Sequence, residues 1–198
     1  MPSSPAPEVP LEPESASVPP RRMRWLALVG AIAVAGAGAA WVLWTRETPK
    51  PDARSTQVSS AGIARPGEIA PGFVMPNLSG RGDVQFDAGR PTVLTFWASW
   101  CAPCRKEFPL LAQAQSENPD LRIFGVVYKD IPADARAFVA EMDVHWENAT
   151  DAGGDVASAY GVRAIPQVFF VNREGVIVSR VYGLSTRRQL DDELAKIR

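Results

Sequence analysis

The segment FWASWCAPCRKE, residues 96–107, contains both cysteines of this 198-residue chain, Cys101 and Cys104, with an alanine and a proline between them. Residues 91–97, directly before the pair, are β-branched and aromatic and almost entirely apolar, which is typical of a strand covered on both faces. Apolar residues after the pair recur with helical spacing through Ala114. The two cysteines are therefore predicted at a junction where a buried strand turns into a helix.

A thiol at the start of a helix has a specific chemistry. The unpaired N–H groups of the first turn and the helix dipole favour the thiolate, and such sites lower a cysteine pKa from ~8.5 into the range ~3.5–7.5. The thiolate is the nucleophile in disulfide exchange, so we expect Cys101 to attack and Cys104 to resolve the mixed disulfide. Pro103 lacks an N–H group and has a preset φ, so it stiffens this corner.

Other roles for a cysteine pair fit less well. A zinc site needs two further ligands, and His145 is the only histidine in the sequence. A purely structural disulfide would close so short a loop that it removes little entropy from the unfolded chain. Inert buried thiols fit poorly with the exported location argued below, where disulfides persist. We therefore expect a redox-active disulfide between Cys101 and Cys104, with no metal and no cofactor.

The composition excludes several other classes of protein. The net charge of −1 argues against a nucleic-acid-binding protein, which would show a basic surface. Two cysteines cannot build the multi-disulfide framework of a small secreted domain. Much of the proline lies before residue 72, so it marks a tail and a linker rather than the folded domain.

The first part of the chain has the pattern of a membrane anchor. Residues 1–22 are rich in proline and are predicted to be a disordered cytoplasmic tail. Residues 23–45 contain an uncharged run that would span ~30 Å as a helix, with tryptophans near both ends. Arginines gather before this run, so the positive-inside rule places the N-terminus in the cytoplasm and the rest beyond a bacterial inner membrane, in the periplasm.

An alternative is a cleaved signal peptide, because the small residues at 37–39 form an acceptable cleavage pattern. The apolar run continues past that site, which favours an uncleaved single-pass anchor. Residues 46–68 are polar, with Pro, Ser and Thr, and are predicted to be a flexible linker. Residues 69–198 are long enough for one well-buried domain.

The pattern within residues 69–198 predicts an α/β fold. Strands are expected at 73–78, 84–86, 91–97, 121–127, 167–171 and 176–181, and helices after Pro103, at 134–142, at 155–160 and from a cap at residues 185 and 186 onward. Alternating strands and helices require parallel neighbours, whereas the turn at 172–175 joins an antiparallel hairpin. We therefore expect a mixed central sheet with helices on both faces.

The segment around the cysteines closely resembles the active site of thioredoxin-like proteins, and in particular the membrane-anchored, periplasm-facing oxidoreductases of the ResA, TlpA and CcmG (DsbE) type. A second motif agrees with this resemblance: residues 164–166, Ala-Ile-Pro before a predicted strand, are similar to the segment that carries a cis-proline opposite the cysteines in that fold. The resemblance covers residues 69–198 and implies a thioredoxin-like fold preceded by one transmembrane helix.

The resemblance also implies roles for individual residues. Cys101 would be the exposed nucleophile and Cys104 the resolving thiol, with Trp100 and Pro103 as supporting residues of the motif. Pro166 would form a cis peptide bond with Ile165, and the two would present backbone groups to a bound substrate chain.

Glu107 matches an acidic residue that tunes the thiols and handles protons in the ResA-like branch. The alternative is that Glu107 only places a favourable negative charge in the first turns of a helix.

Three features of the sequence bear on which of these relatives the chain is most similar to. Thr95 stands where thioredoxin has a buried aspartate six residues before the first cysteine, and a hydroxyl cannot replace that carboxylate as a proton acceptor. Gln167 stands where the CcmG branch typically has glutamate. Residues 128–130, Tyr-Lys-Asp, resemble a CcmG feature. The sub-branch therefore stays open.

The expected function is a tethered reductase of disulfides in exported proteins. The resemblance implies apocytochrome c as substrate, in cytochrome c maturation, or copper-delivery and oxidase-assembly proteins, as for TlpA. It also implies a membrane electron donor of the DsbD/CcdA kind. Two alternatives remain: an oxidant that inserts disulfides, and a non-catalytic assembly factor that holds a client or metal. The Ala-Pro dipeptide between the cysteines is closer to the Gly-Pro of thioredoxin than to the His-containing oxidants, which favours the reductase.

Overall fold

The computed structural model describes residues 57–58, 63–184 and 186–198, all within one unit, Ala53–Arg198. The strands are β1 (Gln57–Val58), β2 (Phe73–Pro76), β3 (Asp83–Phe86), β4 (Thr92–Trp97), β5 (Arg122–Tyr128), β6 (Glu147–Asp151), β7 (Gln167–Val171) and β8 (Ile177–Val181). The helices are α2 (Ala102–Glu117), α3 (Pro132–Glu141), α4 (Asp155–Ala159) and α5 (Arg187–Leu194). Every strand and helix predicted within residues 69–198 is present, with ends shifted by a few residues.

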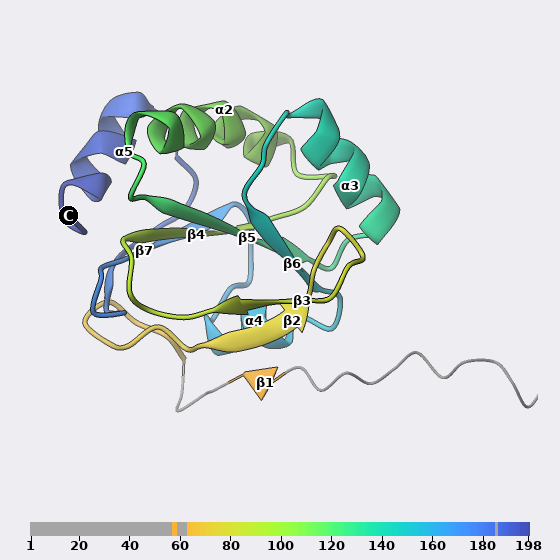
Figure 1. The fold of residues 1–198 in the computed structure, drawn as a ribbon, viewed down its shortest axis with the longest axis horizontal. Coiled ribbons are helices and arrows are strands. Elements are labelled where there is room, and N and C mark those ends of the chain that lie inside the picture. The colour runs from red at the N-terminus through yellow and green to blue at the C-terminus, as the bar shows by residue number, and fades with distance from the viewer. Residues whose placement is uncertain (1–56, 59–62, 185) are drawn as a thin grey trace, which may run out of the picture. The chain divides into compact units, whose positions relative to one another are not determined.

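Five strands form the central sheet, in the order β6-β5-β4-β7-β8 (Figure 1). β5 lies parallel to β4 and to β6, whereas β7 is antiparallel to β4 and β8 is antiparallel to β7. The prediction of a mixed sheet is therefore confirmed. The ends of β4, β5 and β8 and the start of β7 consequently lie together, at the side of the sheet where β4 ends. We call this side, which runs across the strands, the C-terminal edge of β4.

Helices cover both faces of this sheet, as predicted (Figure 1). On one face α2, α3 and α5 pack with residues such as Phe108, Phe138 and Leu190 in a continuous apolar core. On the other face, α4 and the β2–β3 hairpin enclose a second core around Phe73 and Tyr160. β4 contributes to both cores, and all six of its residues are buried. This rigid strand therefore fixes the position of the residues that follow it.

β6 is missing from the prediction because its sequence, Glu-Asn-Ala-Thr-Asp, lacks an apolar run. Hydrogen bonding to β5 and buried polar contacts define this strand. The indole of Trp97 donates a 3.0 Å hydrogen bond to Oδ1 of Asn148, which is 4 % exposed. Both atoms lie against Gly125, where a Cβ atom would overlap Asn148 and lie 2.7 Å from Trp97 Nε1. Glycine is therefore required at the centre of β5.

The first described residues pack onto the domain. Ala64 is buried and its N–H group donates to the carbonyl of Ala159, while Gly67 donates to Ile177. These residues and β1 fall within the segment that the sequence assigns to the linker. The predicted tail and the membrane helix at 23–45 lie outside the described residues. Within the described part, no helix is both long and apolar enough to cross a membrane.

Candidate active site

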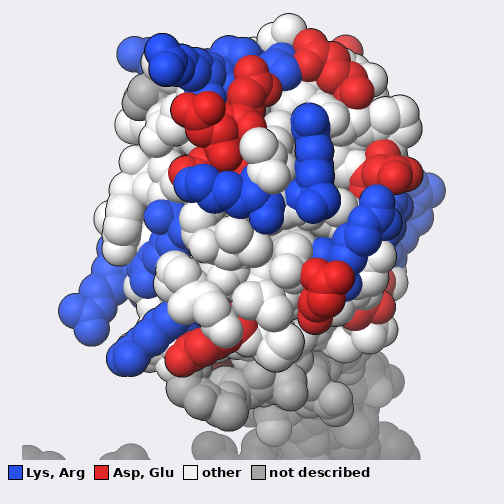
Figure 2. Space-filling model, turned by 90° about the vertical axis from the view of Figure 1, so that its left-hand side faces the viewer, with Lys and Arg blue, Asp and Glu red and all other residues white. Residues whose placement is uncertain are grey.

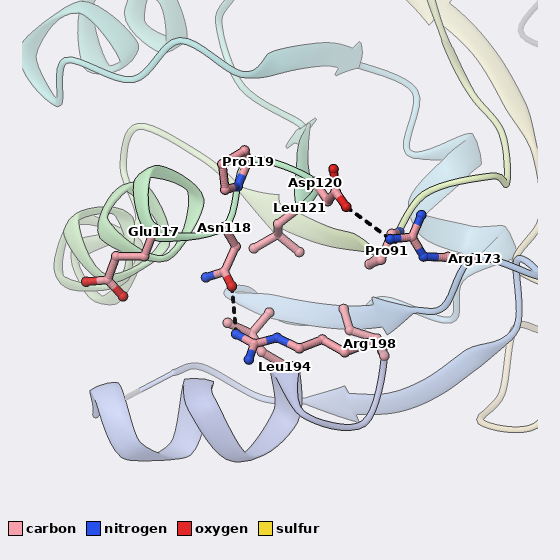
Figure 3. Close-up of a pocket in the computed structure, with 10 residues that line it drawn as sticks. Pro91, Glu117, Asn118, Pro119, Asp120, Leu121, Arg173, Leu194 and Arg198 are labelled. Atoms are coloured by element: carbon pink, nitrogen blue, oxygen red, sulfur yellow. Dashed lines mark hydrogen bonds and ion pairs between the residues drawn. The ribbon is translucent and has the colours of Figure 1, made fainter.

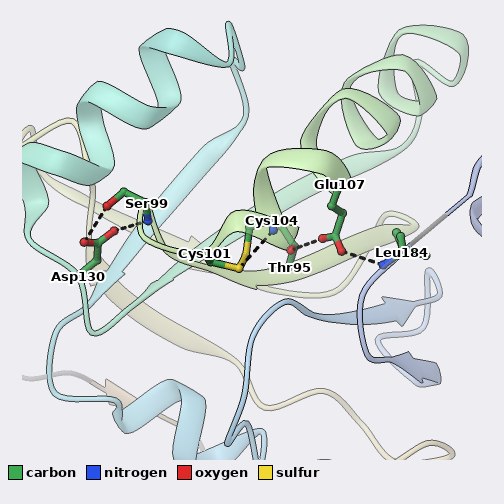
Figure 4. The surroundings of a disulfide bond; sticks show 7 residues. All are labelled: Thr95, Ser99, Cys101, Cys104, Glu107, Asp130 and Leu184. Atoms are coloured by element: carbon green, nitrogen blue, oxygen red, sulfur yellow. Dashed lines mark hydrogen bonds between the residues drawn. A yellow bond between two sulfur atoms is a disulfide. The ribbon is translucent and has the colours of Figure 1, made fainter.

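Cys101 and Cys104 form a disulfide at the start of α2, with their Cα atoms 5.3 Å apart (Figure 4). Cys101 is the N-cap residue of the helix, and its Sγ atom accepts a 3.2 Å hydrogen bond from the N–H group of Cys104. Pro103, the second helical residue, has no N–H group that would need a partner there. The structure thus places the sulfur of Cys101 at the N–H groups of the first turn, an arrangement that favours a thiolate in the reduced protein.

The two sulfurs differ in access. Cys101 keeps 4 % of its surface exposed, whereas Cys104, in the first turn of α2, is fully buried. Trp100, next to Cys101, is 60 % exposed and stands out from the surface beside the disulfide. An attacking sulfur can therefore reach the pair from the Cys101 side.

Glu107 lies one turn beyond Cys104 and is buried, with 1 % of its surface exposed. Its Oε1 atom accepts a 3.0 Å hydrogen bond from the hydroxyl of Thr95 on β4, and its Oε2 atom accepts one of 3.0 Å from the N–H group of Leu184 (Figure 4). Burial raises the pKa of Glu107 from its ordinary value of 4.5 to about 7, although both hydrogen bonds act in the opposite direction. This carboxyl group can exchange a proton near neutral pH.

The position of Glu107 argues against the simpler role of an acid that favours a helix start. Such an acid interacts with the open N–H groups of the first turn from the solvent-exposed surface. Glu107 is the sixth residue of α2 and points inward, onto Thr95 of the central strand. Its carboxyl group is therefore buried between α2 and β4, one turn along the helix from Cys104.

The peptide bond between Ile165 and Pro166 is cis, as predicted from the resemblance. Pro166 directly precedes β7, so it lies at the C-terminal edge of β4, together with the disulfide. A Cβ atom on Gly183 would lie 3.6 Å from Cγ of Pro166, which places the segment after β8 beside this proline. Pro166 itself is buried, and Ile165 is half-buried between the two cores.

The structure brings further residues to the site. Asp130, in the loop after β5, binds the backbone and hydroxyl of Ser99, two residues before Cys101. In the sequence, Thr95 is a departure from thioredoxin and Asp130 is part of a segment that resembles a CcmG feature, but neither pattern indicates a partner for the residue. No signal in the sequence could identify Leu184, since it acts through its backbone N–H group across 77 positions.

A cavity of about 580 Å³ lies at the opposite end of the sheet (Figure 3). It is lined by Pro91 and Leu121, which precede β4 and β5, whereas the disulfide follows β4. Its arginines already have partners: Arg173 is paired with Asp120 at 3.2 Å, and Arg198 donates to an asparagine. This cavity is therefore separate from the disulfide chemistry.

The end of the molecule that carries α5 and the C-terminus shows basic and acidic side chains interspersed, without a field of one sign (Figure 2). Within the described part of the chain, no three His, Cys, Asp or Glu side chains gather in a way that could hold a metal ion.

Residues 66–180 match the model of the AhpC/TSA family. ResA, a thiol-disulfide oxidoreductase from Bacillus thuringiensis subsp. konkukian, is 31% identical over an aligned length of 137 residues, with 66% of this chain and 78% of ResA covered. HelX, a thiol:disulfide interchange protein from Rhodobacter capsulatus, is 36% identical over 102 residues, 51% of this chain and 57% of HelX.

Solved structures agree with these relatives. A thiol:disulfide interchange protein of the DsbE type from Chlorobium tepidum superposes with a TM-score of 0.63 at 29% identity, over 68% of this chain and 99% of that protein. Given the cysteine pair at the start of α2, the cis-proline at the same edge and these relatives, the chain belongs to the AhpC/TSA family of thioredoxin-like proteins and is a thiol-disulfide oxidoreductase.

Proposed function

We propose that this protein is a reductase of disulfides in exported proteins, held at the periplasmic face of the bacterial inner membrane by residues 23–45. The observation that carries this proposal is the cysteine pair at the start of α2, followed one turn later by a buried carboxyl group with a pKa of about 7. Such a pair can cycle between dithiol and disulfide while a neighbouring group takes up and returns protons.

The proposed cycle conserves electrons and atoms. The Cys101 thiolate attacks one sulfur of a client disulfide, which forms a mixed disulfide and releases the other client sulfur as a thiolate. Cys104 then loses its proton and attacks the Cys101 sulfur, so that the second client sulfur leaves and the internal disulfide forms. The client gains two electrons and the pair loses two, which a membrane dithiol donor of the DsbD/CcdA kind returns.

In this cycle Glu107 is the proton acceptor for the resolving step. Cys104 is fully buried, so its proton cannot pass directly to solvent. Glu107 lies one turn along the same helix and changes protonation near neutral pH, which suits a group that takes a proton from Cys104 and returns it during reduction.

The proposed client is apocytochrome c, whose haem-binding cysteines must be reduced before haem is attached. The likeness of the chain to ResA and to DsbE-type proteins supports this choice. Proteins that deliver copper or assemble oxidases, the clients implied by the likeness to TlpA, offer the same chemistry, a disulfide between two accessible cysteines.

The reduction potential of the full chain tests the proposal. The chain, purified in detergent, is equilibrated with dithiothreitol redox buffers, and its free thiols are trapped and counted. We expect a value near or below that of thioredoxin, ~−270 mV. A value near that of DsbA, ~−120 mV, would make the protein an oxidant. A pair that does not cycle would leave only a role in holding clients.

A further inference from the structure

Asp130 joins the two loops that flank the disulfide. Its Oδ2 atom accepts a hydrogen bond of 2.5 Å from the backbone N–H group of Ser99, and its Oδ1 atom accepts one of 3.0 Å from the Ser99 hydroxyl (Figure 4). Oδ1 also accepts a 2.8 Å bond from the N–H group of Ile131. One carboxylate thereby holds the loop after β4 and the loop after β5 together.

A routine structural role does not account for this arrangement. An aspartate before a helix usually caps it by binding N–H groups of the first turn. Ile131 is the N-cap residue of α3, and this helix has no side-chain cap. Asp130 is bound instead to a different loop, and Lys129 before it has a left-handed backbone, with φ of 47°. A lysine held in this unfavourable region indicates that the position of Asp130 is closely constrained.

The two loops each carry a large, exposed apolar side chain. Trp100 follows Ser99 and is 60 % exposed, while Ile131 follows Asp130 and is 63 % exposed. Because β4 and β5 are parallel, both residues lie at the same edge of the sheet as Cys101. Large exposed apolar side chains on two joined loops beside a reactive group are typical of a surface that binds a partner.

The chemistry of Cys101 determines what that partner is. A client cysteine joined to Cys101 brings its neighbours in the client chain with it, at ~3.3 Å per residue in an extended segment. Trp100 is adjacent to Cys101, and Ile131 is held beside the same loop by Asp130. Client residues that flank the cysteine therefore come within reach of the two loops that carry these side chains.

We propose that Asp130 is a positioning residue for client recognition: it holds Trp100 and Ile131 as one apolar platform, on which an extended client segment with apolar residues beside its cysteine docks. This inference rests on the proposed function, since it names a specificity of the same site. The platform discriminates between clients and has no part in the exchange of electrons.

The test compares two kinds of disulfide with the reduced full chain in detergent. One kind is a pair of synthetic peptides, each with a disulfide-bonded Cys-x-x-Cys, flanked by leucines in one and by serines in the other. The other kind is oxidised glutathione, which is too small to cover the platform. Four variants are measured: Asp130→Ala, the milder Ser99→Ala, Ile131→Ser, and Ile69→Ser as a matched control. Ile69 is 65 % exposed, but it is bridged to Val176 at the opposite end of the sheet.

We expect Ile131→Ser and Asp130→Ala to slow reduction of the leucine-flanked peptide by about tenfold, as when one aliphatic side chain loses its buried contact, with the glutathione rate changed by less than about twofold. Ser99→Ala removes one of the bonds to Asp130 and should give a smaller loss in the same direction. Ile69→Ser should change neither rate. The wild-type chain should reduce the leucine-flanked peptide faster than the serine-flanked one.

Equal losses toward peptide and glutathione would overturn the inference, because Asp130 would then shape the disulfide itself. It would also be overturned if Ile131→Ser reduced the leucine-flanked peptide at the wild-type rate. Each of these results leaves the proposed function intact. A wild-type chain that reduces no disulfide at all would instead overturn the proposed function, and the inference with it.

Discussion

The hydroxyl group of Thr95 donates a 3.0 Å hydrogen bond to Oε1 of Glu107, which links the central strand to the helix that carries both cysteines. Thr95 is fully buried, and its hydroxyl stabilises the ionised carboxylate against the cost of burial. The N–H group of Leu184 is a second donor to Glu107, and Cys104 lies one turn back on α2. Both hydrogen bonds to Glu107 come from neutral donors that favour its ionised form. Removing the Thr95 hydroxyl should therefore change the pKa of Glu107 directly.

Replacing Thr95 with valine should raise the pKa of Glu107 above about 7, because it removes a donor that favours the charged form without changing the shape of the side chain. Loss of one hydrogen bond to the charged carboxylate should make Glu107 bind its proton about tenfold more tightly. The titration of the Glu107 carboxyl carbon, followed by NMR in the oxidised chain, measures this effect. Thr95→Ser keeps the hydroxyl and should restore the wild-type midpoint. An unchanged midpoint in Thr95→Val would show that the hydroxyl has no such influence.

Replacing Glu107 with glutamine should change how stability depends on pH. Because burial raises the pKa of Glu107 to about 7, the folded chain binds the proton more tightly than the unfolded chain, whose glutamate titrates near 4.5. The stabilisation is complete below about pH 4.5 and is lost as the pH rises through 7, by up to about 3 kcal/mol. Glu107→Gln cannot ionise and should therefore gain stability relative to wild type between pH 5 and 8.

Urea unfolding of oxidised wild type and Glu107→Gln at pH 5 and at pH 8 measures this difference in stability. Glu141→Gln is the control, because Glu141 is an exposed glutamate paired with Arg105, and it should follow the wild-type pH dependence. Parallel curves for Glu107→Gln and wild type would contradict a protonated Glu107 at neutral pH.

Single serine replacements of the cysteines should have opposite effects on client capture. Cys101 keeps some exposed surface and Cys104 has none, so of the two cysteines a client sulfur can reach only Cys101. In Cys104→Ser the mixed disulfide at Cys101 has no resolving thiol, and an adduct with a disulfide-bonded peptide should accumulate. Non-reducing mass spectrometry detects the adduct. Stronger capture by Cys101→Ser would reverse the assigned roles.

Gly125→Ala should destabilise the domain by about 3 kcal/mol, because a Cβ atom there overlaps Asn148 and breaks its hydrogen bond with Trp97. Gly72→Ala is a suitable control, since its Cβ atom would meet a neighbouring carbonyl oxygen at 3.4 Å, an ordinary contact. Chemical unfolding compares the two variants. Equal stability would mean that β5 and β6 can shift to accept the methyl group.

Local patterns in the sequence predict most of the fold, because β4, β5 and β7 are buried apolar runs and α2 follows a recognisable motif. β6 could not be predicted, since its polar residues are held by contacts with strands far away in the sequence. The same reason explains which parts of the site could be predicted and which could not. The cysteines and Pro166 lie in motifs, whereas the bonds from Thr95 to Glu107 and from Ser99 to Asp130 exist only once distant segments have packed together.

The hydrogen bond from Leu184 to Glu107 also bears on the order in which parts of the domain are synthesised and folded. The two residues are 77 positions apart, so Glu107 leaves the ribosome well before its second donor. Contacts at such separation form late in folding, because a long loop must first close. A chain clipped after β8 would keep both cysteines but bury a carboxyl group with one partner fewer. Proteolytic loss of the chain from Leu184 onward would therefore alter the proton chemistry of a redox pair that lies in a different part of the chain.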